Sequence, residues 1–241
     1  MLRLENISKS YRADHQVLTN INLNVAAGEI VGLVGESGSG KSTLAKVIMQ
    51  LESADKGTVF FQNQQIAKKQ RHAFYKDCQI IFQNASNALN PMWTVKELLR
   101  EPLQHHSKVP DTHYDEMLDM VKLSKDILYA LPSELSGGEK QRINLLRSIL
   151  VEPKLLVCDE IVSSLDRLTQ REIIDLLLKL NKEKNMAILF ISHDLKAVSY
   201  LCQRIYVMKT GKMVDECYKE QDGFHFSDSY AKRLFQAMKM A

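Results

Sequence analysis

Short apolar runs separated by turn residues dominate the N-terminal part of the chain. Three runs rich in β-branched and aromatic residues predict strands: 2–7, 17–25 and 57–61. The runs Ile30–Val34, Leu155–Cys158 and Ala187–Ile191 are apolar without alternation. This pattern is typical of strands that are covered on both faces of a parallel sheet. The chain is therefore predicted to contain a buried parallel sheet accompanied by shorter strands.

The pattern changes to helical spacing between residues 83 and 150. Thr94–Glu97 has the residue types of a capping box, and prolines punctuate the segment. We expect an α/β core formed by 1–83 and 151–215, with a helical subdomain inserted at 84–150. The remaining tail, 216–241, has apolar residues at helical spacing around Tyr230 and predicts a helix packed on the domain.

Composition narrows the class of protein. The chain has 241 residues, 45% of them hydrophobic, which suits one large domain with a proper core. A net charge of +3 is mild and gives no reason to expect nucleic acid as a partner. The four cysteines form no CxxC pair, which fits a reducing cytosolic setting. We find no signal peptide and no apolar run near the roughly 20 residues that span a bilayer, so any membrane role would require partner chains.

The segment Gly35-Glu36-Ser37-Gly38-Ser39-Gly40-Lys41-Ser42 has the spacing of a phosphate-binding loop. It follows the apolar run Ile30–Val34 and precedes a helical pattern that begins near Thr43. Backbone N–H groups of such a loop point at the β-phosphate, and the positive end of the helix lies behind them. We expect Lys41 to reach the β- and γ-phosphates and Ser42 to bind Mg²⁺. The sequence therefore predicts a nucleoside triphosphate site.

Polar residues follow two of the predicted buried strands. Asp159 and Glu160 end one, and Ser192-His193-Asp194 follow the other. Because ligands of open parallel sheets collect at the carboxyl ends of strands, we expect these groups to converge on Lys41. Asp159 would bind Mg²⁺ through water, and Glu160 would activate the attacking water as general base. The alternative is a solvated acidic pair in a loop.

A second glycine-containing helix start lies at Leu135-Ser136-Gly137-Gly138-Glu139. Ser136 and Glu139 have the spacing of a capping box. The two glycines expose N–H groups at the predicted helix start, which makes it a second anion-binding end. In an unrelated protein an ordinary helix cap would explain the same residues.

Taken together, these motifs resemble the ATP-binding subunits of ABC transporters over essentially the whole chain. The matching segments are Gly35–Thr43 as the phosphate loop, Gln83 as the Q-loop glutamine, Leu135–Glu139 as the signature motif, Leu155–Glu160 as the strand carrying the Mg²⁺ ligand and base, Ser163-Ser164-Leu165-Asp166 as the D-loop and His193 as the switch histidine. Tyr11 lies where the family places an adenine-stacking aromatic. The resemblance implies a P-loop NTPase core with a mainly parallel sheet and an antiparallel β subdomain.

The resemblance also implies an activity and a set of partners. It implies ATP hydrolysis with ATP and Mg²⁺ as cofactors, with catalytic roles for Glu160, His193 and Gln83 and a further Mg²⁺-binding role for Gln83. Two such domains sandwich two ATP molecules, each signature motif facing the partner's ATP; Ser164 and Asp166 belong to the D-loop. The chain departs from the family at Glu139, where Gln is usual, and at Ile161, where Pro is common.

The closer likeness is to the second ATPase of the peptide/nickel importer group. It rests on phrases such as Ile81-Phe82-Gln83-Asn84, Leu99–Leu103 and Cys202–Ile205. Nickel-type members are the nearer match, because little chain follows Tyr230–Leu234, where many oligopeptide members carry a cysteine-bearing extension. The resemblance implies a peripheral subunit on the cytoplasmic face of the membrane. It would assemble with a second ATPase (a sibling or a copy of itself), two permease chains and an extracytoplasmic binding protein.

Three other functions are alternatives. A dipeptide or oligopeptide importer is the first alternative, because it shares the subfamily. A non-transport ABC ATPase usually has tandem domains or a long coiled-coil insertion. A P-loop GTPase would need an Asn-Lys-x-Asp motif, and Asn181-Lys182-Glu183-Lys184 lacks the Asp.

Overall fold

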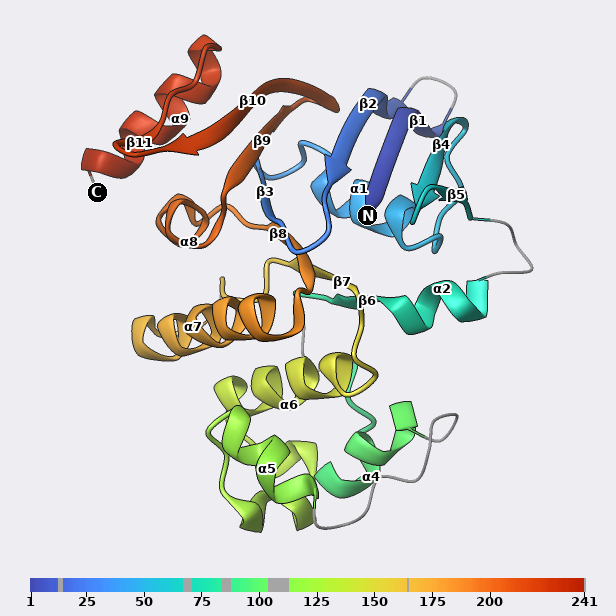
Figure 1. The fold of residues 1–241 in the computed structure, drawn as a ribbon, viewed down its shortest axis with the longest axis vertical. Coiled ribbons are helices and arrows are strands. Elements are labelled where there is room, and N and C mark those ends of the chain that lie inside the picture. Colours follow the sequence, from blue (N-terminus) through green and yellow to red (C-terminus); the bar gives the residue numbers. More distant parts are fainter. Residues whose placement is uncertain (13–14, 67–70, 84–87, 104–112, 164, 241) are drawn as a thin grey trace.

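The computed structural model describes residues 1–241 apart from 13–14, 67–70, 84–87, 104–112, 164 and 241. Within the described residues the strands form a seven-stranded sheet in the order β11-β10-β9-β3-β8-β7-β6 and a four-stranded antiparallel sheet in the order β2-β1-β4-β5. The strands β6, β7, β8, β3 and β9 of the large sheet run parallel to their neighbours, and β10 and β11 continue it in antiparallel fashion. The α/β fold with a mainly parallel sheet and an antiparallel part is confirmed (Figure 1).

Strands and helices are interspersed along the chain. The strands are β1 (Leu2–Arg12), β2 (His15–Val25), β3 (Ile30–Val34), β4 (Lys56–Phe61), β5 (Gln64–Gln65), β6 (Cys78–Ile81), β7 (Leu155–Asp159), β8 (Ala187–Ile191), β9 (Arg204–Lys209), β10 (Lys212–Glu220) and β11 (Gly223–Phe224). The helices are α1 (Lys41–Ile48), α2 (Arg71–Asp77), α4 (Val95–Arg100), α5 (His113–Met120), α6 (Gly137–Ile149), α7 (Arg167–Lys184), α8 (Leu195–Leu201) and α9 (Ser229–Met240), with short 3₁₀ turns at Glu101–Leu103, Lys125–Tyr129 and Pro132–Glu134.

The central strands are apolar at every position because both faces of the sheet are covered. In β3, Ile30 and Val34 join a hydrophobic cluster with helices α4 to α9, whereas Val31 and Leu33 join a second cluster with α1 and the antiparallel sheet. All five residues of β3, β7 and β8 are buried. The lack of alternation thus reflects two cores, one on each side of the sheet.

The helical region gathers at one end of the molecule, and the antiparallel sheet lies at the other (Figure 1). Helices α4, α5 and α6 form that end, and α6 packs next to β6. The predicted capping box at the start of α4 is present: Thr94 accepts from the Glu97 N–H, and the Glu97 carboxylate accepts from the Thr94 N–H. None of the described helices is long and apolar enough to cross a membrane.

The predicted strands occur, with small differences in their ends. The N-terminal hairpin is longer than expected, because polar residues extend β1 and β2 beyond the apolar positions that predicted them. The expected boundary between residues 215 and 216 falls inside β10, which pairs with β9 along most of its length. The C-terminal segment thus continues the main sheet, and its predicted helix is α9.

Candidate functional site

The phosphate loop lies between the end of β3 and the start of α1, as its sequence predicts. Gly40 is the N-cap of α1 and has φ of 105°, in the left-handed region that favours glycine. Gly35 passes so close to β9 that an added Cβ would lie 2.1 Å from the Met208 carbonyl oxygen. The Gly211 N–H donates to the Ser39 carbonyl at 3.0 Å. The loop is therefore shaped by its glycines and supported by the β9–β10 turn.

Lys41 turns back into the loop that precedes it. Its ammonium group donates to the carbonyl oxygens of Gly35 and Glu36, each at 2.9 Å, and lies 3.4 Å from the Ser39 hydroxyl. Burial lowers the pKa of Lys41, and the charges of Glu160 and Asp159 oppose this shift. The site thus holds a buried cation beside two carboxylates at the centre of a phosphate-binding loop.

Asp159 and Ser42 form a pair of oxygen ligands from two elements. The Ser42 hydroxyl donates to Asp159 Oδ1 at 3.3 Å, and Asp159 is 5% exposed. Burial raises the pKa of Asp159, because desolvation disfavours the carboxylate. A buried carboxylate beside a hydroxyl at a phosphate loop fits Mg²⁺, which prefers oxygen ligands together with substrate phosphates.

Glu160 is held between two groups that come from distant parts of the chain. Its carboxylate accepts a hydrogen bond from Gln83 Nε2 at 2.9 Å, and its other oxygen lies 3.5 Å from His193 Nδ1. The parallel pairing of β7 with β8 sets Asp159 beside Ile191, which brings Glu160 next to the segment carrying His193. The structure therefore brings together the three residues predicted to be catalytic.

The backbone of Glu160 is unusual for a non-glycine residue. Its φ is 53°, in the left-handed region that costs free energy for a residue with a side chain. The Glu160 N–H donates to the Ile191 carbonyl at 2.9 Å, and its own carbonyl accepts from the Ser163 hydroxyl at 2.9 Å. These two bonds stabilise the conformation that turns the Glu160 side chain toward Gln83 and His193.

The predicted signature segment begins α6 and lies well apart from the phosphate loop at α1 (Figure 1). Ser136 is the N-cap, and its hydroxyl accepts from the Glu139 N–H at 3.3 Å. The Glu139 carboxylate accepts from the Ser136 N–H at 2.8 Å, so both halves of the predicted capping box are present. Hydrogen bonds from the Ser136 side chain and backbone lower the pKa of Glu139. The segment is an exposed helix start rather than a wall of the Lys41 site.

The other predicted site residues have separate positions. Asp166 caps α7, accepting from the Leu168 and Thr169 N–H groups at 3.0 Å each. Ser164 lies outside the described residues. Tyr11 is half exposed on β1, and its hydroxyl donates to Glu52 Oε1 at 2.8 Å. The Lys9 ammonium lies over this ring, 5.8 Å from its centre.

Two contacts at the site were missed by reasoning from the sequence. One is the Ser163 hydroxyl on the Glu160 carbonyl, which the D-loop assignment does not imply. The other joins the phosphate loop to the C-terminal helix, where the Glu36 N–H donates to the Tyr230 hydroxyl at 3.2 Å. No local pattern could have found the second contact, because the two residues are 194 positions apart.

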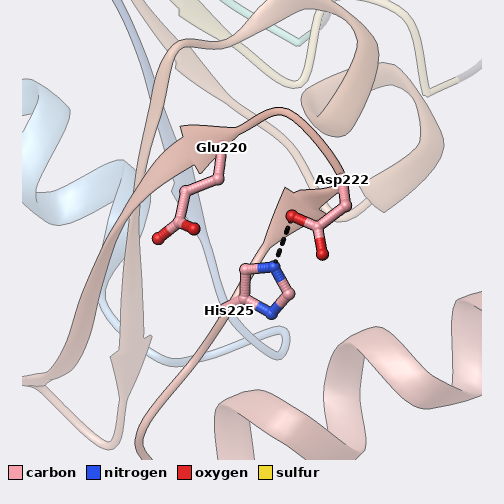
Figure 2. Close-up of side chains that lie close together, drawn as sticks. All are labelled: Glu220, Asp222 and His225. Atoms are coloured by element: carbon pink, nitrogen blue, oxygen red, sulfur yellow. Dashed lines mark hydrogen bonds and ion pairs between the residues drawn. The ribbon is translucent and has the colours of Figure 1, made fainter.

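A separate group of metal-ligand side chains lies on the β10–β11 hairpin (Figure 2). Among the described residues, Glu220, Asp222 and His225 place one ligand atom each within 4.8 Å of one another. His225 Nε2 and Asp222 Oδ1 are 2.8 Å apart, and all three residues are exposed. The hydrogen bond between His225 and Asp222 accounts for their arrangement, and we assign no ligand to the group.

The fold and the site define a class of protein. A glycine loop after the buried strand β3, a lysine inside it, and two carboxylates at the end of β7 in the same sheet are the parts of a P-loop nucleoside triphosphatase. The pattern of the ABC transporter family matches residues 18–163. This chain belongs to the ABC transporter family and is one of its ATPases.

The curated relatives and solved structures are consistent with that assignment. The nickel import ATP-binding protein NikE of Shigella boydii serotype 4 (strain Sb227) is 44% identical over 214 residues, which is 86% of this chain and 80% of the relative. The protein of the same name from Escherichia coli (strain K12) is 44% identical over 83% of this chain and 78% of the relative.

Among solved structures, the dimeric post-hydrolysis state of the ATP-binding cassette MJ0796 bound to ADP and Pi has a TM-score of 0.81 and 29% identity, covering 90% of this chain and 98% of that chain. The structure of cbiO1 from Clostridium perfringens, described as part of the ABC transporter complex cbiONQ, has a TM-score of 0.79 and 26% identity, covering 89% of this chain and 87% of that chain.

Proposed function

We propose that this chain is an ATP-hydrolysing subunit on the cytoplasmic face of the cell membrane that powers import of nickel, another divalent metal or a metal chelate. The observation that carries the proposal is the cluster of Gln83, Glu160 and His193 beside the phosphate loop, in a chain that is 44% identical to nickel import ATPases over 86% of its length. In that site Glu160 lies between Gln83 and His193 and close to Lys41.

Each residue has a role that follows from its chemistry. Lys41 and the phosphate loop, residues 35–43, bind the phosphates, and Tyr11 stacks on adenine. Ser42, Asp159 and Gln83 would hold Mg²⁺, which neutralises charge on the phosphates when bound. Glu160 takes the proton from the attacking water, and His193 contacts the γ-phosphate. The amide of Gln83 keeps the Glu160 carboxylate oriented by donating to it.

The exposed start of α6 supports a sandwich of two ATPase subunits. Its N–H groups form an anion-binding end, and within one chain they lie far from the phosphate loop. We propose that Leu135–Glu139 contacts ATP held by the partner, with Ser164 and Asp166 of the D-loop at the same interface. The partner is a sibling ATPase or a second copy of this chain.

Coupling to transport requires a surface that moves with the nucleotide. Gln83 contacts the catalytic carboxylate, and the nearby helical subdomain carries Met92, which is 80% exposed, and the half-buried Trp93. We propose that two permease chains dock around Gln83 and Trp93, and that an extracytoplasmic binding protein delivers the cargo. ATP closes the sandwich and favours one permease state, and hydrolysis reopens it.

The test combines gene deletion with a matched pair of variants. Deletion should lower cell-associated nickel under metal limitation, and the wild-type gene should restore it. Glu160→Gln should bind ATP normally but lose about 10²–10⁴-fold in turnover, because the general base is removed, and it should not restore uptake. Glu183→Gln, on the exposed surface of α7, is the control and should restore it fully.

Two outcomes contradict the proposal in different ways. Turnover of Glu160→Gln within a few-fold of wild type removes the general-base assignment while leaving the cargo open. Unchanged nickel, cobalt and zinc contents in the deletion strain, together with lost growth on a peptide nitrogen source, make the cargo a peptide instead.

A further inference from the structure

The C-terminal helix α9 reaches the phosphate loop through a single side chain. Tyr230, in the first turn of α9, is 7% exposed, and its hydroxyl accepts a hydrogen bond from the Glu36 N–H at 3.2 Å. Burial raises the pKa of Tyr230, and the hydrogen bond from the Glu36 N–H opposes this shift. The phenol thus contacts the backbone of the second residue of the loop.

The position of this hydroxyl is set by a chain of contacts behind it. Asp228 caps α9 by accepting from the Tyr230 and Ala231 N–H groups at 2.8 and 3.1 Å. Asp215, on β10, accepts from the Asp228 N–H at 2.8 Å and so ties the start of α9 to the main sheet. The Lys209 ammonium lies 4.7 Å from the centre of the Tyr230 ring, within the range of a cation–π contact.

The contact matters because it fixes one end of a peptide group whose other end holds Lys41. The Gly35 carbonyl accepts from the Lys41 ammonium at 2.9 Å, and the N–H of the same peptide group is the one that donates to Tyr230. A planar peptide cannot rotate its carbonyl without rotating its N–H. Tyr230 therefore influences the direction of the Gly35 carbonyl. Because this carbonyl accepts from Lys41, Tyr230 also influences the position of the Lys41 ammonium group.

We propose that Tyr230 is a positioning residue for the phosphate loop. It holds the Gly35–Glu36 peptide group in the orientation that sets Lys41 inside the loop, and it makes nucleotide affinity depend on the docking of α9. Without the hydroxyl, this peptide group adopts other orientations in part of the molecules. The apparent affinity for nucleotide then falls in proportion to the fraction of molecules whose loop is in the binding conformation.

The test uses Tyr230→Phe, which removes the hydroxyl and keeps the ring that packs under Lys209. Loss of a hydrogen bond of this kind should raise the dissociation constant for ATP, and the KM for ATP, by roughly 3- to 10-fold, with kcat changed less than 2-fold. The control is Tyr129→Phe, in the helical region, where the ring is 75% exposed; it should leave the dissociation constant unchanged.

A second measurement does not depend on affinity. Hydrogen exchange of the Glu36 amide should be several-fold faster in Tyr230→Phe than in wild type, while the amide of Leu33 in β3 keeps its protection. An unchanged dissociation constant overturns the proposal, as does an unchanged Glu36 exchange rate. A fall in kcat with no change in KM also overturns it, because the hydroxyl would then act on the chemical step.

Discussion

At the scale of single residues, the site contains ionisable side chains that are buried, Lys41 and Asp159. Asp159 is buried at the end of β7, and its carboxylate is disfavoured by desolvation, which raises its pKa from the ordinary value of 3.8. A buried carboxylate that is costly in the absence of its ligand is well suited to gain from a bound cation. Asp159 thus lowers the stability of the ligand-free protein, and binding of the proposed Mg²⁺ would offset this cost.

We predict that Asp159→Asn stabilises the ligand-free protein and inactivates it. The free-energy gain is on the order of 1 kcal/mol, or roughly 2–4 °C in Tm at pH 7 to 8, because the amide carries no charge to desolvate. Since the raised pKa means that the native state holds its proton more tightly, wild type loses stability as pH rises through the folded pKa. The advantage of the variant should therefore shrink as pH falls toward 3.8.

Thermal melts at several pH values, with chelator present, check this prediction. Asp119→Asn, on the exposed end of α5, is the matched control and should shift Tm little at any of these pH values. A lower Tm for Asp159→Asn at pH 7 would show that the Ser42 hydrogen bond outweighs the cost of burying the charge.

At the scale of elements, helix starts carry much of the recognition. α1 begins at the phosphate loop, and α6 begins at a capping box whose carboxylate is charged, since hydrogen bonds from Ser136 lower the pKa of Glu139. The negative charge at the start of α6 also interacts favourably with the helix dipole. The same charge would lie near an ATP bound at this helix end by a partner subunit.

We predict that Glu139→Gln retains the helix and keeps or modestly raises ATPase activity. The amide oxygen can still accept from the Ser136 N–H. In the proposed sandwich, the substitution would also remove a negative charge near the partner's ATP. The loss of stability should stay below about 1 kcal/mol, the usual size of a charge–dipole contribution. Ser136→Ala removes the side chain of the N-cap itself and should cost about 0.5–2 kcal/mol. Steady-state ATPase assays and denaturant titrations measure both; complete inactivation by Gln would reveal a separate need for the acid.

At the scale of the whole molecule, one buried arginine ties the two sheets together. The Arg204 side chain is 4% exposed and forms a two-pronged ion pair with Glu29 at 2.7 and 2.8 Å. It also donates to Glu216 on β10 at 2.8 Å and to the Asn24 carbonyl on β2 at 2.9 Å. Removing one partner of such a network leaves the others desolvated without compensation.

We predict that Arg204→Ala lowers the free energy of unfolding by roughly 3 kcal/mol and Tm by roughly 6–12 °C. The control is Arg171→Ala, whose ion pair with Asp175 is exposed and should contribute less than about 0.5 kcal/mol. Calorimetry on both variants decides the matter. Equal effects would mean that the Arg204 network is as weak as a surface pair.

The sequence was sufficient to predict the local parts of this protein. The glycine loop, the capping boxes of α4 and α6, the buried strands and the helix α9 were all predicted, because each signal lies within about ten neighbouring residues. Of the core strands, β6, β9 and β10 were not predicted. They carry polar residues that only sheet pairing explains, as Arg204 in β9 illustrates.

The sequence predicted that Glu160 and His193 converge near Lys41, but only the tertiary structure decided how Gln83 and Tyr230 join this site. Gln83 follows β6 and His193 follows β8, and they reach Glu160 from opposite sides because β7 lies between those two strands. Tyr230 reaches Glu36 because the hydrogen bond between Asp228 and Asp215 of β10 holds the start of α9 near the phosphate loop. The order of the strands and the position of α9 near the phosphate loop both depend on two hydrophobic cores that are built from residues of the whole chain. The chemical identity of the site is therefore local in sequence, whereas its geometry is a property of the whole fold.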